Sequence, residues 1–155
     1  MKITAWRIVQ AKHLASAFDG EGAKHFPGRW NHRGTPMVYT AGSLSLAALE
    51  MLVNIATEQI PSTFMAVPVT FDDHCCKRIA PDQLPPDWAG HPILSSTRDL
   101  GSGWVQSKAS PVLALPSAVV PIETNFLINP LHPEFSKIRI GSAEAFTYDP
   151  RLIKK

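Results

Sequence analysis

Short β-type segments, separated by glycine and proline, recur along the whole of this 155-residue chain. They are rich in valine, isoleucine, threonine and aromatic residues, which favour strands. We expect strands at residues 3–9, 37–40, 64–71, 112–121 and 124–130, and within 137–146. Pro68 interrupts the third of these, which predicts an edge strand or a bulge there. A sheet of short strands is therefore the expected centre of the fold.

One segment has strong helix character. Residues 44–56 are a run of mostly leucine and alanine that follows Ser43, a residue type that caps helix N-termini. Helical spacing predicts a common apolar face for Leu46, Leu49, Val53 and Ala56. Glu50 is the only acidic residue of this segment and lies at the flank of that face, where it would be partly desolvated.

The remaining segments complete the expected fold. Residues 18–34 and 72–94 carry glycines or prolines and should be loop or extended chain. A second helix is expected over residues 95–109, entered through Ser96 or Thr97 and ended by Pro111. Since no repeat or linker is visible, the chain is predicted to be a single α+β domain over residues 1–155.

Charge and cysteine usage narrow the function classes. The net charge is +2 and only 18% of the residues are charged, which does not support binding to a polyanion such as nucleic acid. No apolar run reaches the roughly 18 residues of a membrane span, and the first residues lack a secretory signal. Cys75 and Cys76 are adjacent and cannot form an ordinary disulfide with each other. We therefore expect a cytoplasmic protein.

A cluster of acids, His74 and the two cysteines over residues 72–76 suggests a metal site at first sight. Zinc sites need a second cysteine or histidine pair at a matching interval, and the chain has none. A polar turn after a strand is the simpler interpretation, so no metal is assigned. The six histidines are scattered, and none is given a catalytic role.

The loop over residues 18–34 combines glycines with cationic side chains, among them Arg29. Glycine lets a backbone approach closely and cations attract anions, so such loops often contact phosphate. By itself this pattern is weak, because a solvated loop has a similar composition.

Four motifs in order give the chain a specific appearance. They are Gly28-Arg29-Trp30-Asn31, VYTA at residues 38–41, ALE at residues 48–50, and LPSAVVP at 115–121 leading into ETNFLINP at 123–130. In this order and spacing the sequence closely resembles the RES-domain toxins of bacterial RES–Xre toxin–antitoxin pairs. The resemblance extends from Trp6-Arg7 to the last expected strand. One departure is Pro27, which stands where the family usually has a second glycine.

The resemblance implies a fold related to ADP-ribosyltransferases and NAD as substrate rather than as cofactor. It implies loss of nicotinamide from NAD by hydrolysis, by phosphorolysis with inorganic phosphate, or by transfer of ADP-ribose to an acceptor. It also implies a cognate Xre-type antitoxin that covers the active site.

The same resemblance places Arg29, Tyr39 and Glu50 at the catalytic centre. Cleavage of the nicotinamide–ribose bond has an oxocarbenium-like transition state, which a fixed carboxylate such as Glu50 can stabilise. Arginines suit the pyrophosphate of NAD, which assigns substrate binding to Arg29 and Arg7, while the Tyr39 ring can stack on the substrate. Three further candidates for substrate binding or orientation are Trp30, Ser117 and Asn125.

Two alternatives remain open at this point. The first is a protein ADP-ribosyltransferase that uses NAD as donor, since the residues named above do not include the acceptor site. The second and more distant one is a nucleic-acid-acting toxin, supported by the cations between Lys24 and Arg33. Without the family, Glu50 would be interpreted as a solvated carboxylate and Arg29 as a surface arginine.

Overall fold

The computed structural model describes residues 1–55 and 63–153 of the chain. Its strands are β1 (Lys2–Gln10), β2 (Val38–Ala41), β3 (Phe64–Asp72), β4 (Cys76–Arg78), β5 (Val112–Pro116), β6 (Thr124–Ile128), β7 (Arg139–Ile140) and β8 (Glu144–Phe146). Its α-helices are α1 (Glu21–His25), α2 (Leu44–Asn54) and α3 (Ser95–Ser107). The predicted α+β fold is confirmed, and each expected strand is present.

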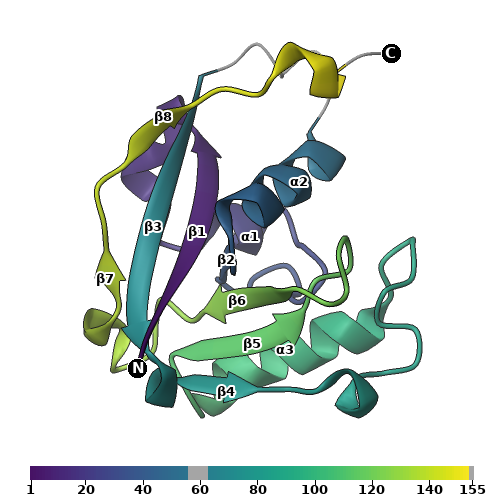
Figure 1. Ribbon diagram of the computed structural model, residues 1–155. Coiled ribbons are helices and arrows are strands. Elements are labelled where there is room, and N and C mark those ends of the chain that lie inside the picture. The colour runs from purple at the N-terminus through teal and green to yellow at the C-terminus, as the bar shows by residue number, and fades with distance from the viewer. Residues whose placement is uncertain (56–62, 154–155) are drawn as a thin grey trace.

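The strands form one curled sheet in the order β4-β5-β6-β2-β1-β3-β7, with β8 also pairing with β3. All neighbours are antiparallel except β4 and β5, which are parallel. Figure 1 shows that β1 and β3 run steeply across the view whereas β4, β5 and β6 run along its lower part. The curl therefore gives the sheet two differently oriented halves.

A narrow junction joins these halves. Strand β1 pairs with β3 over its whole length, from Lys2 opposite Asp72 to Gln10 opposite Phe64. Its pairing with β2, by contrast, rests on Trp6 opposite Ala41. Beyond that pair the two strands diverge, so side chains rather than ladder hydrogen bonds must connect β1 to the rest of β2.

Of the two settings predicted for Pro68, an edge strand or a bulge, the edge strand is wrong. Strand β3 is flanked by β1 on one side and by β7 and β8 on the other. The Pro68 carbonyl accepts a hydrogen bond of 2.7 Å from the Gly141 amide, and Gly141 lies between β7 and β8. Because N–H and C=O of one strand residue point to the same side, the amide that proline lacks would face this break between the two short strands.

Helix α2 begins as predicted but buries a different face. The Ser43 hydroxyl accepts a 3.1 Å hydrogen bond from the Leu46 amide and caps the helix. Leu46 and Ala47 are buried against β1 and β2, whereas Leu49 is 39% exposed and Val53 61% exposed. The apolar face predicted from Leu46, Leu49 and Val53 is thus wrong, and Ala56, its fourth member, lies outside the described residues.

The reason lies in the composition of the helix. Nearly every position from 44 to 53 is apolar, so spacing alone does not distinguish one face from the next. The side chains that pack towards the sheet are Leu44, Leu46, Ala47, Ala48, Met51, Leu52 and, beyond the helix, Ile55.

Helix α3 covers the other half of the sheet, behind β4 and β5 (Figure 1). Trp104 and Val105 pack on Leu113, Leu115 and Leu127, which project from β5 and β6. The helix ends at Ser107 because Lys108 adopts a left-handed conformation (φ 54°), so Pro111 is not the residue that ends it. All five residues of β5 are buried, since its opposite face belongs to a second apolar cluster around Phe71 and Phe126.

Two other expectations need correction. Residues 18–34 contain the short helix α1, and residues 72–94 contain the three-residue strand β4 at the end of the sheet. Both elements contain too few residues for a helical or strand periodicity to be recognised in the sequence. Within residues 1–55 and 63–153, none of the helices has the length and apolarity needed to cross a membrane.

Candidate active site

Arg29 lies in the loop between α1 and β2, where its guanidinium is held by backbone oxygens. The Nη1 atom donates hydrogen bonds to the carbonyls of Trp88 (2.9 Å) and Gly90 (2.8 Å). Burial lowers the pKa of Arg29, while the negative charge of Glu50 raises it. Arg29 therefore lies within electrostatic reach of Glu50, in a fixed orientation that a flexible surface arginine would lack.

Tyr39 projects from the middle of β2 towards the same loop. Its hydroxyl donates a 2.6 Å hydrogen bond to Asn31 Oδ1 and accepts one of 3.1 Å from the Trp30 amide. Burial raises the pKa of the Tyr39 hydroxyl well above its usual range, so the phenol is neutral at physiological pH. The hydroxyl thus binds the loop over residues 26–37 that carries Arg29, which we call the arginine loop.

Gly28 makes room for this tyrosine. A Cβ atom at residue 28 would lie 2.7 Å from Tyr39 Oη, closer than any ordinary contact. The Gly28 amide donates to Asn31 Oδ1 (2.9 Å), and its carbonyl accepts from Arg98 Nε on α3 (2.9 Å). The glycine of the GRWN motif is therefore explained by the close approach of Tyr39.

Glu50 lies on α2 and is half-buried. Its Oε2 atom accepts a 2.8 Å hydrogen bond from the hydroxyl of Ser117, which is fully buried after the end of β5. The same hydroxyl oxygen accepts from the amides of Val119 (3.0 Å) and Val120 (3.1 Å). Ser117 is thus held in place by the 117–120 turn and orients the carboxylate, while Oε1 of Glu50 has no hydrogen-bond partner among the described residues.

Three separate elements thus bring the predicted catalytic residues together. The loop before β2 supplies Arg29, β2 supplies Tyr39, and α2 supplies Glu50. The Glu50 carboxylate raises the pKa of Arg29, and the Tyr39 hydroxyl binds the backbone amide that follows Arg29. A fixed carboxylate stabilises developing positive charge, and a fixed guanidinium binds an anionic group. This combination suits a substrate that carries phosphate on one side of the reacting bond.

Arg7 lies at the junction between β1 and β2. Its Nη1 atom donates a 3.0 Å hydrogen bond to the Tyr39 carbonyl, which connects the strands beyond the Trp6–Ala41 pair. Burial lowers the pKa of Arg7 to about 10, while the negative charge of Asp19 acts to raise it. Its Nε atom is buried without a hydrogen-bond partner among the described residues. Arg7 therefore supports the backbone of Tyr39 directly.

The other two predicted substrate-binding residues have different surroundings. Trp30 is only 3% exposed and packs in the core below α3, stacked on Trp88 with ring centroids 6.5 Å apart. Its burial in this core points to packing rather than to contact with a substrate. Asn125 is half-buried on β6, opposite Ala41 of β2 and Leu115 of β5. Glu50 follows β2 along the chain, on α2, and Ser117 follows β5.

Three residues with supporting roles were not singled out by the sequence prediction. Asn31 accepts hydrogen bonds from Gly28 and Tyr39, and Arg98 holds the carbonyl of Gly28. Tyr148 donates from its hydroxyl to the Ala48 carbonyl on α2 (2.5 Å). Asn31 was quoted as part of the GRWN motif, but nothing in the sequence around Arg98 or Tyr148 signals a partner 70 or 100 positions away.

Several basic side chains over residues 18–34 have acidic partners. Lys24 and His25 both contact Glu21, and His32 Nε2 lies 2.6 Å from Asp99 Oδ1. This pairing reduces the positive field that a nucleic acid would need. The described part of the chain also holds no group of three or more histidine, cysteine or acidic side chains that could bind a metal ion.

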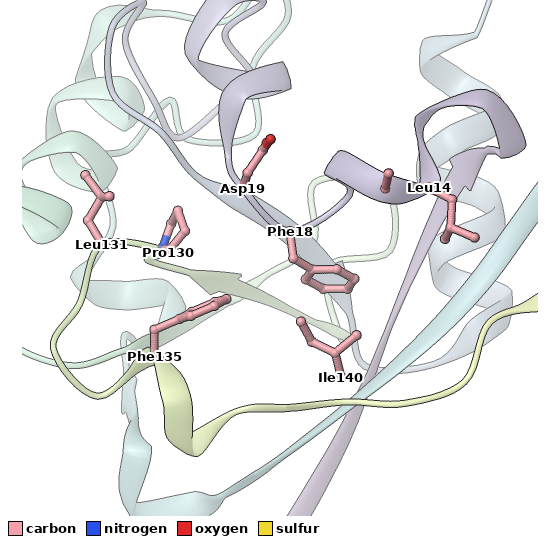
Figure 2. A pocket seen from close by; sticks show the side chains of 8 residues that line it. Leu14, Phe18, Asp19, Pro130, Leu131, Phe135 and Ile140 are labelled. Atoms are coloured by element: carbon pink, nitrogen blue, oxygen red, sulfur yellow. The ribbon is translucent and has the colours of Figure 1, made fainter.

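One hollow of the surface lies away from these residues. It is an apolar pocket of about 570 Å³, and Figure 2 shows Phe18, Phe135 and Ile140 converging on it. The pocket contains none of the predicted site residues. Its lining consists of Leu14, Ala15, Phe18, Asp19, Pro130, Leu131, Phe135 and Ile140.

A family model and several known proteins match this chain, and they indicate the same family. A family model described as the RES domain matches residues 4–149. A protein of Yersinia enterocolitica named Toxin Res is 38% identical over 149 residues, which cover 95% of this chain and 97% of the relative. A protein of Sphingobium sp. named Prs ADP-ribosylating toxin is 36% identical over an alignment that covers 100% of this chain and 99% of the relative.

A solved structure shares the fold. The crystal structure of the M. tuberculosis MbcT–MbcA toxin–antitoxin complex contains a chain that aligns with a TM-score of 0.78 and 18% sequence identity. The alignment covers 99% of this chain and 87% of that one. At this identity the likeness establishes the architecture.

Proposed function

This chain belongs to the RES-domain family, and we propose that it is the toxin of a toxin–antitoxin pair that cleaves the nicotinamide–ribose bond of NAD. In this reaction the C1′–N bond breaks and its electron pair stays on the nicotinamide nitrogen, which becomes neutral. The ribosyl group is left with oxocarbenium character. Water or inorganic phosphate then adds to C1′, and a proton is released.

Each residue has a defined task in this proposal. The Glu50 carboxylate stabilises the ribosyl cation or a ribose hydroxyl through Oε1, the oxygen that Ser117 leaves unoccupied. Arg29 binds the pyrophosphate with the guanidinium N–H groups that do not contact Trp88 and Gly90. The Tyr39 ring, whose hydroxyl is engaged elsewhere, contributes its apolar face to the substrate.

One observation carries the proposal. An isolated acidic side chain on an apolar helix is oriented by a fully buried serine and lies within electrostatic reach of a half-buried arginine. Structural ion pairs on protein surfaces do not need such support. Fixed charges in a partly desolvated site are what stabilisation of a developing cation requires.

The direct test is product analysis of NAD incubated with the purified protein, with and without phosphate. Hydrolysis gives nicotinamide and ADP-ribose, and phosphorolysis gives a phosphorylated ADP-ribose only when phosphate is present. Glu50→Ala should abolish nicotinamide release while the circular dichroism spectrum stays unchanged. Wild-type protein that releases no nicotinamide with water, phosphate or candidate acceptor proteins would contradict the proposal.

The same proposal includes an antitoxin of the Xre type that covers the site, and a cytoplasmic location. The chain with the same fold in the MbcT–MbcA complex and the relatives named Toxin Res support a partner of this kind. Leu49 and Val53, exposed on α2 on either side of Glu50, supply an apolar surface that such a partner can bury. The free cysteines 75 and 76 fit the reducing cytoplasm.

A second candidate is transfer of ADP-ribose to a protein. The observation that favours it is the Sphingobium relative, similar over the whole chain and named an ADP-ribosylating toxin. Both candidates share the bond that breaks and differ only in the acceptor. Incubation of labelled NAD with the protein and a cell extract separates them, because transfer labels a polypeptide whereas hydrolysis and phosphorolysis label none.

A further inference from the structure

Asn31 uses all of its hydrogen-bonding capacity on groups between residues 23 and 39. The side chain is fully buried, and Oδ1 accepts from the Gly28 amide (2.9 Å) and from the Tyr39 hydroxyl (2.6 Å). The orientation of the amide group is determined by its surroundings, because Nδ2 faces only carbonyl oxygens. These belong to Ala23 (2.7 Å), His32 (3.2 Å) and Thr35 (3.1 Å).

The contacts of Asn31 and Tyr39 enclose Arg29 on both sides along the chain. The amide of Gly28, before Arg29, donates to Asn31 Oδ1. The amide of Trp30, after Arg29, donates to the Tyr39 hydroxyl, whose own proton goes to the same Asn31 oxygen. One oxygen atom therefore connects the two backbone amides that flank the arginine.

Gly28 packs closely against Tyr39. The Cα atom of Gly28 approaches the Tyr39 ring so closely that a Cβ would lie 2.7 Å from Oη and 2.8 Å from Cζ. Glycine at residue 28 is therefore what allows the loop to lie this close to the Tyr39 hydroxyl. We call Gly28, Asn31 and Tyr39 together the loop lock.

We propose that Asn31 is a positioning residue for the site: through the loop lock it sets the position of Arg29 and with it the binding of the substrate phosphates. The catalytic part of this inference rests on the proposed function, whereas the loop lock itself does not. It also gives the Tyr39 hydroxyl a role in holding the loop rather than in proton transfer, because its proton is donated to Asn31.

Hydrogen exchange at two backbone amides tests the loop lock without any substrate. In the ¹⁵N-labelled full chain, Tyr39→Phe removes the acceptor of the Trp30 amide only, so Trp30 should exchange at least tenfold faster while Gly28 stays protected. Asn31→Ala should accelerate both amides. Unchanged exchange at Trp30 in Tyr39→Phe, or at Gly28 in Asn31→Ala, overturns the loop lock.

NAD turnover tests the positioning. Contacts to the phosphates are made in the bound substrate and in the transition state alike, so a displaced Arg29 should raise KM and leave kcat nearly unchanged. For Asn31→Ala we expect KM to rise about tenfold or more, with kcat within about threefold of wild type. A lower kcat at unchanged KM overturns the positioning role.

Asn129 offers a matched control. It is also a buried asparagine with two backbone partners, the Val105 carbonyl and the Leu131 amide. It directly follows the C-terminal end of β6 and has no hydrogen bond to the loop lock among the described residues. Asn129→Ala should lose a similar amount of stability without changing KM or the exchange of Gly28 and Trp30. If it reproduces the effects of Asn31→Ala, the role of Asn31 is merely structural and the proposal fails.

Gly28→Ala replaces Asn31→Ala if the latter does not fold. It disturbs the loop lock from its other side, because the added methyl group pushes against Tyr39 while Asn31 is intact. The same rise in KM and the same faster exchange at Trp30 are expected, and wild-type behaviour would overturn the proposal. If the wild-type protein does not cleave NAD, the proposed function fails, and the exchange rates alone decide whether Asn31 holds the loop.

Discussion

The two charged groups of the site are held in place in different ways. Arg29 lies in a loop whose flanking amides are both hydrogen-bonded, and its guanidinium contacts two backbone carbonyls. Glu50 lies on a helix, and among the described residues its carboxylate accepts one hydrogen bond, from Ser117. The arginine is thus fixed by many contacts in an irregular segment, the glutamate by one contact and the helix beneath it.

This difference follows from the local structure. A loop has no ladder of its own, so a precise arginine there needs side chains such as Asn31 and Arg98 to bind its backbone. A helix satisfies its own backbone and needs support only for the carboxylate. Each side also depends on one of the chain's two tyrosines, with Tyr39 bound to the loop and Tyr148 to α2.

The strongest way to break the glutamate side is Glu50→Gln. The amide keeps the shape of the side chain and an oxygen for Ser117, but it removes the negative charge that stabilises the ribosyl cation. We expect kcat for nicotinamide release to fall by about 10²–10³ or more. Glu144→Gln, which changes an exposed carboxylate on β8, should have no effect. Comparable activity of the two variants would contradict the role of Glu50.

On the arginine side, Arg29→Lys keeps the charge and removes the planar fork. A lysine ammonium has no planar, five-donor geometry with which to hold the Trp88 and Gly90 carbonyls and also present a paired contact to a phosphate. We expect KM for NAD to rise by about 10- to 100-fold, with a smaller change in kcat. Arg33→Lys, an exposed arginine of the same loop, is the control and should behave as wild type.

A smaller effect is expected when the support of Glu50 is removed. In Ser117→Ala the carboxylate keeps its charge but loses its only hydrogen bond among the described residues, so kcat should fall about tenfold while KM changes little. Loss of the acceptor for the Val119 and Val120 amides should cost about 1–3 kcal/mol of stability in urea unfolding.

Ser110→Ala provides the matched comparison, because Ser110 is also a buried hydroxyl with two partners, Trp104 Nε1 and the Val112 carbonyl. It should lose similar stability and keep its kcat. Equal kcat in Ser110→Ala and Ser117→Ala would show that Ser117 supports only the fold.

The smallest effect concerns pH and the tyrosine that holds α2. Burial raises the pKa of Tyr148 to about 12, whereas an unfolded tyrosine titrates near 10. The stability that comes from keeping this hydroxyl protonated is fully present below pH 10 and is lost as pH rises towards 12. The free energy of unfolding should therefore fall less in Tyr148→Phe than in wild type between pH 10 and 12, by about 1–3 kcal/mol.

Subtracting the pH dependence of the unfolding free energy of Tyr148→Phe from that of wild type isolates the contribution of Tyr148. Tyr39, whose pKa is also raised by burial, lowers the stability of both in the same range, and Arg7, whose pKa burial lowers to about 10, acts in the opposite direction in both. Parallel curves for wild type and Tyr148→Phe would contradict the prediction. At pH 7, Tyr148→Phe should cost about 1 kcal/mol through the lost bond to Ala48.

Local sequence patterns predicted the elements of the fold well. Strands β1, β2, β3, β5 and β6 and the cap of α2 at Ser43 follow from residue types that act over a few positions. The buried face of α2 was predicted wrongly, and so was the edge-strand alternative for Pro68. Both depend on contacts with segments far along the chain, such as Tyr148 and Gly141, which spacing does not encode.

For the site, resemblance to the family named the central residues, and the structure adds how they are held. Nothing around Ser117 indicates that its hydroxyl donates to Glu50, 67 positions earlier. For Trp30, the sequence suggested a role that its surroundings do not favour. Its place beside Arg29 suggested a pocket wall, whereas the side chain is buried under α3. Packing over such distances is a property of the folded chain alone.

These long separations have a consequence for synthesis on the ribosome. Glu50 emerges well before Ser117, which orients it, and Ala48 emerges 100 residues before Tyr148, which holds the helix. A nascent or prematurely terminated chain that ends before residue 117 therefore carries Arg29, Tyr39 and Glu50, the three proposed catalytic residues, without the hydrogen bond from Ser117 to Glu50. Under the proposed function, a chain must therefore be nearly finished before it can cleave NAD, and the proposed antitoxin needs to bind folded molecules rather than fragments.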